Sequence, residues 1–238
     1  MARRMFYVQE VRDGVAYLRG ETAQHIRKVL RAERGQLFEI SDGEEIFLAE
    51  IADFGKEMVE FRLIESVPSV TPAARVHLLQ ALIKFDHFEW VLEKATELGV
   101  ERITPVYALR CEKGLDQAAV KRRERWLRIV AESGQQCRRL KPPLLDEPLR
   151  LKSALALESP QKLWLEEAPG APGILSTLRK GEEPILVLCG PEGGWDPRER
   201  EDAKSGGWQA ASLGRQVLRA ETAAISALAV VLAFSESE

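Results

Sequence analysis

Two glycine-bearing segments constrain the fold of this chain more than any other feature. Residues 188–194 read Leu-Cys-Gly-Pro-Glu-Gly-Gly, and residues 213–223 read Leu-Gly-Arg-Gln-Val-Leu-Arg-Ala-Glu-Thr-Ala. Each follows a short apolar run, Ile185–Leu188 or Trp208–Leu213, and each leads into a helical pattern. Loops at the carboxyl ends of strands form the ligand crevice of open α/β sheets. The two segments therefore predict a ligand site where two strands end.

The first 70 residues read as a separate, mostly β domain. Short β-branched or aromatic runs predict strands, and Asp13-Gly14 and Asp42-Gly43 between them are strong hairpin signals. One helix, over about residues 22–31, interrupts strands at 5–9, 15–19, 36–40, 45–51 and 58–64. Residues 66–74 contain Pro68 and Pro72 without periodicity, which indicates a linker. We expect a small β-barrel or β-sandwich over residues 1–70 and a second domain over residues 71–238.

In the second domain, strands alternate with helices, which predicts a mostly parallel sheet covered on both faces. The expected strands are 75–82, 102–106, 144–145, 162–165, 185–188 and 208–213, and the expected helices are 86–98, 117–135, 149–157, 174–178, 197–204 and 221–234. The last helix is apolar nearly all round, so it must be buried on every side. Packing inside the domain and packing against a second subunit would both satisfy that requirement.

Cysteine and histidine usage excludes several classes of protein. Neither the three cysteines nor the three histidines show C-x-x-C or H-E-x-x-H spacing, so we expect no disulfide framework and no metal. The N-terminus lacks a long apolar region, and the longest apolar stretch, 223–234, is too short to span a bilayer. We therefore expect a soluble, cytoplasmic protein without membrane contact.

The charge pattern leaves nucleic-acid binding open. A net charge of −3 argues against generic binding to nucleic acid. Basic residues nevertheless gather between Lys121 and Lys141, and Arg27, Arg31 and Arg34 share one face of a predicted helix. From charge alone, contact with RNA and a merely solvated surface fit these clusters equally well.

The glycine-bearing loops lack the motifs that hold phosphate groups. No Lys-Ser or Lys-Thr pair completes a P-loop, and no G-x-G-x-x-G occurs. Gly190, Gly193 and Gly194 would let the backbone approach a ligand closely. These features predict a small, weakly anionic or zwitterionic ligand held mainly by backbone groups.

The same loops resemble the signature motifs of the RsmE family, the bacterial small-subunit ribosomal RNA uridine N3-methyltransferases of the SPOUT (trefoil-knot) superfamily. Further segments also resemble this family, namely Gln80-Ala-Leu-Ile-Lys84, the run from Glu93 to Pro105, Arg110, and residues 132–143 with Gln136 and Arg139. These matches keep their order from about residue 75 to residue 234. Residues 25–31 and 42–43 resemble the PUA-like RNA-binding domain of the family.

The resemblance implies an α/β fold, with a trefoil-knotted, mostly parallel C-terminal sheet and a smaller N-terminal PUA-like β-barrel. It also implies S-adenosylmethionine bound in the knot, a homodimer, and methylation of uridine N3 in small-subunit ribosomal RNA. Two alternatives remain open. One is a catalytically inactive RNA-binding or ribosome-assembly protein with the same fold, and the other is an α/β enzyme that uses a different nucleotide-like cofactor.

The resemblance also assigns residues to roles. We expect Arg219 to act as a cation near the methyl group or the base, and Glu221 as orienter or base, although Glu221 and Thr222 would also suit helix capping. Expected cofactor contacts are Leu165, Cys189, Gly190, Pro191, Glu192, Gly193, Gly194, Leu213, Gly214, Val217, Leu218, Thr222 and Ala223. Expected RNA contacts are Arg3, Arg4, Lys84, Arg110, Arg138 and Arg139. Arg138 stands where the family more usually has a small residue.

Overall fold

The computed structural model describes residues 3–9, 11–69 and 74–237, which fall into two compact units. The N-terminal unit comprises Met1–Thr71 together with Ala131–Pro142, and the C-terminal unit comprises Pro72–Val130 and Pro143–Glu238. The end of the first stretch lies beside the domain boundary expected between residues 70 and 71. Residues 131–142, by contrast, were expected in the second domain. Part of the expected linker, residues 70–73, lies outside the described residues.

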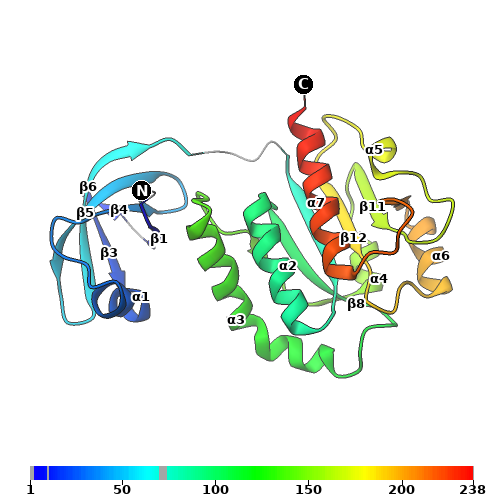
Figure 1. Cartoon of the computed structure of the whole chain (residues 1–238), viewed down its shortest axis with the longest axis horizontal. Coiled ribbons are helices and arrows are strands. Elements are labelled where there is room, and N and C mark those ends of the chain that lie inside the picture. The colour runs from blue at the N-terminus through cyan, green and yellow to red at the C-terminus, as the bar shows by residue number, and fades with distance from the viewer. Residues whose placement is uncertain (1–2, 10, 70–73, 238) are drawn as a thin grey trace. The chain divides into compact units, whose positions relative to one another are not determined.

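The N-terminal unit is built on one six-stranded sheet in the order β1-β4-β5-β6-β3-β2 (Figure 1). Its strands are β1 (Met5–Tyr7), β2 (Val11–Arg12), β3 (Val15–Arg19), β4 (Leu37–Ser41), β5 (Ile46–Phe54) and β6 (Met58–Val67). Asp13 and Gly14 both adopt positive φ between β2 and β3, so the two-residue hairpin turn is as predicted. The rings of Phe6, Phe38 and Phe61 pack in the core of this unit.

The helix expected over residues 22–31 differs in the structure. A short α1 (Gly20–Gln24) runs into a wider π-helical turn, η1 (His25–Val29), in which the Leu30 N–H donates to the His25 carbonyl at 3.0 Å. The wider turn rotates the side chains away from the spacing of a regular helix. Ile26 is therefore fully buried, whereas Val29, three residues further along, is 66% exposed.

Residues 131–142 complete the N-terminal unit from the middle of the chain. The Tyr7 hydroxyl donates to the Arg139 carbonyl at 2.9 Å, and the Ser41 hydroxyl donates to the Leu140 carbonyl at 2.5 Å. Burial raises the pKa of the Tyr7 phenol well above its usual range. These bonds attach the segment to β1 and β4.

The C-terminal unit contains a seven-stranded sheet in the order β10-β8-β7-β12-β11-β13, with β9 paired to β8, and every pairing is parallel. The strands are β7 (Val76–Ala81), β8 (Arg102–Tyr107), β9 (Leu144–Leu145), β10 (Leu149–Arg150), β11 (Gln161–Leu165), β12 (Ile185–Cys189) and β13 (Gln209–Ala211). The helices are α2 (Phe85–Leu98), α3 (Leu115–Gln136), α4 (Leu151–Leu155), α5 (Ile174–Thr177), α6 (Pro197–Ser205) and α7 (Ala220–Glu236), of which α3 continues from residue 131 into the N-terminal unit. The helix expected over residues 149–157 is therefore shortened to α4, because Leu149 and Arg150 pair with β8.

Alternate residues of each strand serve the two faces of this sheet. Leu78 packs with α2, α3 and α7, whereas Leu79 packs with α4 and α6 on the other face. Figure 1 shows α7 beside α2 on the first of these faces. Asp196 caps α6 through a capping box with Glu199, and Pro197 opens the helix, which the sequence predicts to begin at residue 197.

The last helix is buried on one side only within this chain. Ala224, Leu228 and Val231 are fully buried, but Ile225 and Ala229 are half-buried. The expectation that α7 is buried on every side is thus not met inside a single chain. Across the described residues, no helix is both long and apolar enough to cross a membrane.

A buried histidine at the opposite edge of the sheet from the two loops should make stability depend on pH. His77 Nε2 lies 2.7 Å from the Thr104 hydroxyl, which donates to Asp146, and Arg102 binds Asp146 through two bonds of 2.7 and 2.8 Å. Burial lowers the pKa of His77 from 6.5 to about 4; Asp146 opposes this shift and Arg102 adds to it.

We expect this histidine to destabilise the folded chain as the pH falls below the unfolded pKa of 6.5. Below that pH the imidazole binds a proton in the unfolded state, whereas in the folded state it stays neutral down to about pH 4. Between pH 7 and pH 5 the loss in free energy of unfolding should be about 2 kcal/mol. Chemical unfolding at both pH values checks this, and His77→Gln should flatten the dependence. If the free energy of unfolding depended on pH as strongly in that variant as in the parent, His77 would not be the cause.

Candidate active site

A cavity of about 510 Å³ opens at the carboxyl ends of β11, β12 and β13. The loop after β12, the loop after β13 and the first turns of α2 and α7 form its walls. The sequence-predicted residues that line it are Leu165, Gly190, Pro191, Glu192, Gly194, Leu213, Gly214, Val217, Leu218, Ala223, Lys84, Arg219 and Glu221. Both glycine-bearing loops therefore meet at one cavity.

Three of the residues expected to contact the cofactor do not line the cavity in the described part of the chain, namely Cys189, Gly193 and Thr222. Cys189 is fully buried in β12, and burial raises the pKa of its thiol far above the usual range. Gly193 instead packs on Arg110.

Other residues line the cavity without having been predicted, among them His87, Glu166, Glu167, Trp195, Ser212 and Gln216. Glu166 and Glu167 directly follow β11, so the rule that ligands bind at strand ends was a usable signal for both. His87 lies between two family motifs, and the sequence contains no pattern that singles it out.

Close packing inside the chain explains the glycines of the loop after β12. A Cβ atom at Gly190 would lie 3.0 Å from the Trp195 ring, and one at Gly193 would lie 3.0 Å from the Arg110 Cβ. Gly194 has a φ of +66°, and a Cβ there would lie 2.7 Å from Glu167 Oε1. A side chain at any of these positions would force the protein's own neighbours to shift, before any ligand binds.

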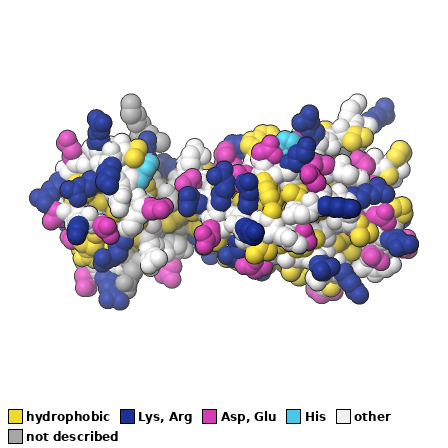
Figure 2. Space-filling view, turned by 90° about the horizontal axis from the view of Figure 1, so that it is seen from below, with side chains coloured by type: hydrophobic (Ala, Val, Ile, Leu, Met, Phe, Trp, Pro, Cys, Tyr) yellow, Lys and Arg dark blue, Asp and Glu magenta, His cyan; other side chains and the backbone are white. Residues whose placement is uncertain are grey.

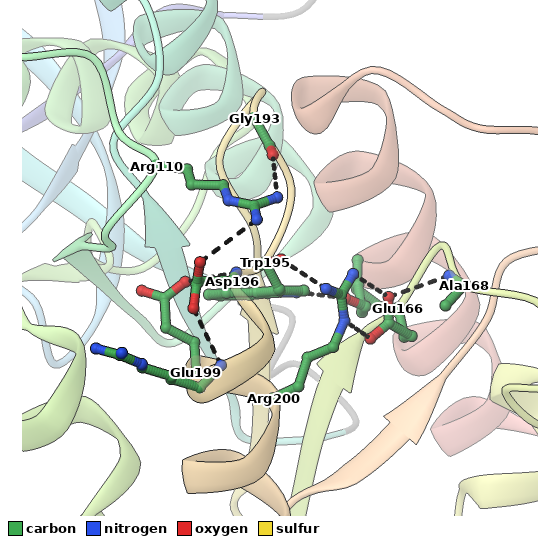
Figure 3. A network of polar contacts seen from close by, with 10 residues as sticks. Arg110, Glu166, Ala168, Gly193, Trp195, Asp196, Glu199 and Arg200 are labelled. Atoms are coloured by element: carbon green, nitrogen blue, oxygen red, sulfur yellow. Dashed lines mark hydrogen bonds and ion pairs between the residues drawn. The ribbon is translucent and has the colours of Figure 1, made fainter.

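Polar contacts fix this loop to the end of β11 (Figure 3). Trp195 Nε1 donates to the Leu165 carbonyl at 2.8 Å. Arg200 binds the buried Glu166 carboxylate through two bonds of 2.6 and 3.0 Å and also donates to the Trp195 carbonyl at 2.6 Å. Burial alone would raise the pKa of Glu166, but its hydrogen bonds with Arg200 and the Ala168 N–H outweigh burial and lower it.

A second set of contacts fixes the loop to the segment after β8. Arg110 Nη1 donates to the Gly193 carbonyl at 3.3 Å, and Arg110 Nη2 lies 3.4 Å from Asp196 Oδ2 (Figure 3). The Leu109 N–H donates to the buried Glu199 at 2.7 Å. Arg110, expected to contact RNA, thus supports the loop, while its side chain stays 46% exposed.

The second loop ends at the N-cap of α7. Arg219 occupies the N-cap position, where its carbonyl accepts a bond of 2.8 Å from the Ala223 N–H, and no side-chain cap is present at this described residue. Thr222 lies inside the first turn, so the alternative role of Thr222 as the helix cap is wrong. Glu221, also in the first turn, is 5% exposed, whereas Arg219 is exposed at the cavity.

The remaining basic residues expected to contact RNA belong to the N-terminal unit. Arg3 and Arg4 are exposed. Arg138 binds the carboxylate of Glu39 with both ends of its guanidinium, one bond being 2.8 Å long, and Glu39 is only 3% exposed. Arg138 therefore neutralises a buried carboxylate, a partner that sequence reasoning missed.

Basic residues of α3 are also paired. Arg122 and Arg125 both bind Glu89 of α2. Figure 2 shows basic and acidic side chains interspersed over the face drawn, in keeping with the small net charge of −3. Within the described ranges, no cluster of three or more His, Cys, Asp or Glu residues could hold a metal ion.

Comparison with known proteins identifies the family. A family model for an RNA methyltransferase domain matches residues 70–232. The chain is 32% identical to ribosomal RNA small subunit methyltransferase E of Rickettsia conorii, over 87% of this chain and 84% of that protein. The chain belongs to the ribosomal RNA small subunit methyltransferase E family. The family predicted from the loop motifs is thereby confirmed.

Solved methyltransferase structures share the fold of this chain. The methyltransferase E of Neisseria gonorrhoeae bound to S-adenosyl methionine is 28% identical, with a TM-score of 0.87 over 96% of each chain. A Legionella pneumophila protein in complex with S-adenosylmethionine is 31% identical, with a TM-score of 0.87 over 98% of each chain. The expected fold class, a trefoil-knot methyltransferase domain with a smaller N-terminal β domain, is confirmed.

Proposed function

We propose that this member of the methyltransferase E family transfers the methyl group of S-adenosylmethionine to N3 of a uridine in small-subunit ribosomal RNA. The observation that carries the proposal is the single cavity at which both family loops converge, with Arg219 and Glu221 on its wall.

The cavity fits S-adenosylmethionine in size and in charge. Its volume of about 510 Å³ is typical of small-molecule sites. Apolar side chains, such as Leu165 and Leu213, line the cavity together with the carboxylates of Glu167, Glu192 and Glu221 and the cations Lys84 and Arg219. The fourth carboxylate, Glu166, is already bound by Arg200. Groups of both signs suit a zwitterionic ligand that carries a sulfonium, an ammonium and a carboxylate group. When bound, the cofactor supplies an electrophilic methyl group.

The proposed reaction requires activation mainly of the uridine, which is the nucleophile. Its N3 carries a proton and is a poor nucleophile until that proton leaves. We assign Glu221 as the group that accepts or orients this proton, because its carboxylate is buried at the cavity wall. We assign Arg219 as the cation that stabilises the negative charge developing on the base. The rigid loops then contribute by positioning the reactants.

We infer that RNA is held by Arg3, Arg4 and Arg139 of the N-terminal unit and by Lys84 and Arg110 of the C-terminal unit. Contacts of this kind bind phosphate groups and position the substrate without reading its sequence. Arg138 joins this set only with the part of its guanidinium that Glu39 leaves accessible; its side chain is 44% exposed. The PUA-like role proposed for the N-terminal unit, which is RNA binding, rests on its own basic residues, Arg3, Arg4, Arg138 and Arg139.

We further infer that the protein acts as a homodimer in the cytoplasm. The half-buried side of α7, with Ile225 and Ala229, would become buried against a second copy. Ribosomal RNA as a substrate supports the cytoplasmic location. Gel filtration with light scattering tests the dimer directly, and a monomer at micromolar concentration would contradict it.

Methyl transfer can be tested with small subunits isolated from cells that lack this gene. We expect the protein to add one methyl group, from labelled S-adenosylmethionine, to a uridine that mass spectrometry of nuclease fragments identifies as N3-methylated. Calorimetry should show binding of S-adenosylmethionine, and thermal shift should favour it over NAD and ATP. Absence of cofactor binding would support the inactive assembly protein instead, and preference for NAD or ATP would support a different enzyme.

A further inference from the structure

A histidine at the cavity faces two carboxylates from two different elements. His87 lies in the first turn of α2. Its Nδ1 atom is 3.5 Å from Glu192 Oε1, in the loop after β12, and 3.7 Å from Glu221 Oε2, at the start of α7. All three residues line the cavity. The imidazole therefore links α2 with both segments that carry the family signature.

The surroundings of Nδ1 determine which ring nitrogen carries a proton. Nδ1 is buried and has no hydrogen-bond partner of normal length among the described residues. A bare lone pair on Nδ1 would point at two negative carboxylates, which is repulsive, whereas an Nδ1–H would be attracted to both. Movement of a few tenths of an ångström would turn either contact into a normal hydrogen bond. The favoured form is therefore the one with a proton on Nδ1.

Glu221 depends on this contact for its orientation. Its side chain is only 7% exposed, so bulk water does little to hold it. In the part of the chain that the structure describes, the contact with His87 Nδ1 is the sole polar contact of the Glu221 carboxylate. Glu192 would repel Glu221 if no positive or proton-donating group stood between them.

We propose that His87 is a positioning residue that donates its Nδ1–H between Glu192 and Glu221 and so holds the Glu221 carboxylate at the cavity wall. The consequence for catalysis rests on the proposed function, because it requires Glu221 to meet the uridine. On the other side of the ring, Asp86 Oδ2 lies 3.8 Å from Nε2, and the cations that line the same cavity are Lys84 and Arg219.

Substitutions that separate the proton donor from simple packing test this role. In single-turnover assays with saturating S-adenosylmethionine, His87→Leu should slow methyl transfer about 10- to 100-fold, because Glu221 loses its orientation. His87→Lys places a donor cation within reach of both carboxylates and should recover the rate to within about threefold of the parent. Asp86→Asn is the matched control, since Asp86 is 77% exposed and touches only Nε2, and its rate should stay within about twofold.

Two readouts distinguish positioning from damage to the fold or the cofactor site. The single-turnover rates are compared at saturating cofactor, and the affinity for S-adenosylmethionine is measured in each variant, so a slower transfer step is separated from weaker cofactor binding. Nitrogen-15 NMR of the imidazole should find the proton on Nδ1 in the parent protein at neutral pH. Glu192→Gln combined with Glu221→Gln should remove that preference.

The outcomes separate this inference from the proposed function. A neutral ring with a bare Nδ1, or a folded His87→Lys variant as slow as His87→Leu, overturns the role of His87. A parent protein that transfers no methyl group to small subunits overturns the proposed function, while the NMR measurement still decides whether His87 bridges the two carboxylates.

Discussion

Replacing Arg219 by alanine is expected to lower the rate of methyl transfer at least about 100-fold while cofactor binding largely survives. Uridine N3 attacks as an anion, and the charge of that anion spreads over the base. Arg219 is an exposed cation at the cavity, next to the buried Glu221. In the proposed mechanism its loss removes an interaction made mainly in the transition state, so the catalytic rate should fall far more than the affinity for S-adenosylmethionine.

Arg215 provides a matched control for this prediction. It lies in the same exposed loop, but it is not among the described residues that line the cavity. Arg215→Ala should therefore leave single-turnover transfer nearly unchanged, and calorimetry should give similar affinities for both variants. Near-normal turnover in Arg219→Ala would remove Arg219 from the mechanism. An equal loss of transfer rate in both variants would indicate that these arginines act by attracting RNA electrostatically, without a specific role for Arg219.

Replacing Arg138 by alanine is expected to destabilise the protein by about 3 kcal/mol, the low end for breaking a buried ion pair because the arginine is partly exposed. Glu39 is 3% exposed, and Arg138 binds both of its carboxylate oxygens. Removing the guanidinium leaves that charge buried without a partner. Urea unfolding measures this loss, and native-state hydrogen exchange of amides in the N-terminal unit shows where it falls.

Two further measurements separate stability from RNA binding. Glu39→Gln added to Arg138→Ala removes the uncompensated charge, and the double variant should regain most of the lost stability. If the double variant stays as unstable as Arg138→Ala, loss of the ion pair with Glu39 is not the cause of the lost stability. In the folded Arg138→Ala, Arg139→Ala protein, RNA affinity should fall more at low salt than at high salt, as expected for lost phosphate contacts. A loss that is independent of salt would indicate damage to the N-terminal unit instead.

Local chemistry in the sequence predicted the features that depend on few neighbouring residues. Asp13-Gly14 specifies its hairpin because both residues accept positive φ, and Asp196-Pro197 marks the start of α6. The two loops were predicted to meet because parallel strands end at the same edge of a sheet. For these features, residues close in sequence carry the information.

Features that depend on distant partners were not predictable in this way. Glu39 and Arg138 are far apart in the chain, and neither sequence pattern reveals that one is buried against the other. The contact of His87 with Glu192 and Glu221 likewise requires three separate elements to be placed first. The knot itself came from family resemblance, because periodicity identifies elements and not the path that connects them.

The N-terminal unit is built from two separate segments of the chain, and this has a consequence for synthesis of the protein. Its contacts include residues 131–142, so the unit is incomplete when only its first stretch has left the ribosome. Until Leu140 has been made, the hydroxyl of Ser41 lacks its acceptor, and until Arg138 has been made, Glu39 lacks its counter-charge. Although N-terminal domains generally fold first during translation, the nascent chain here must grow past the middle of its length before its first unit can close.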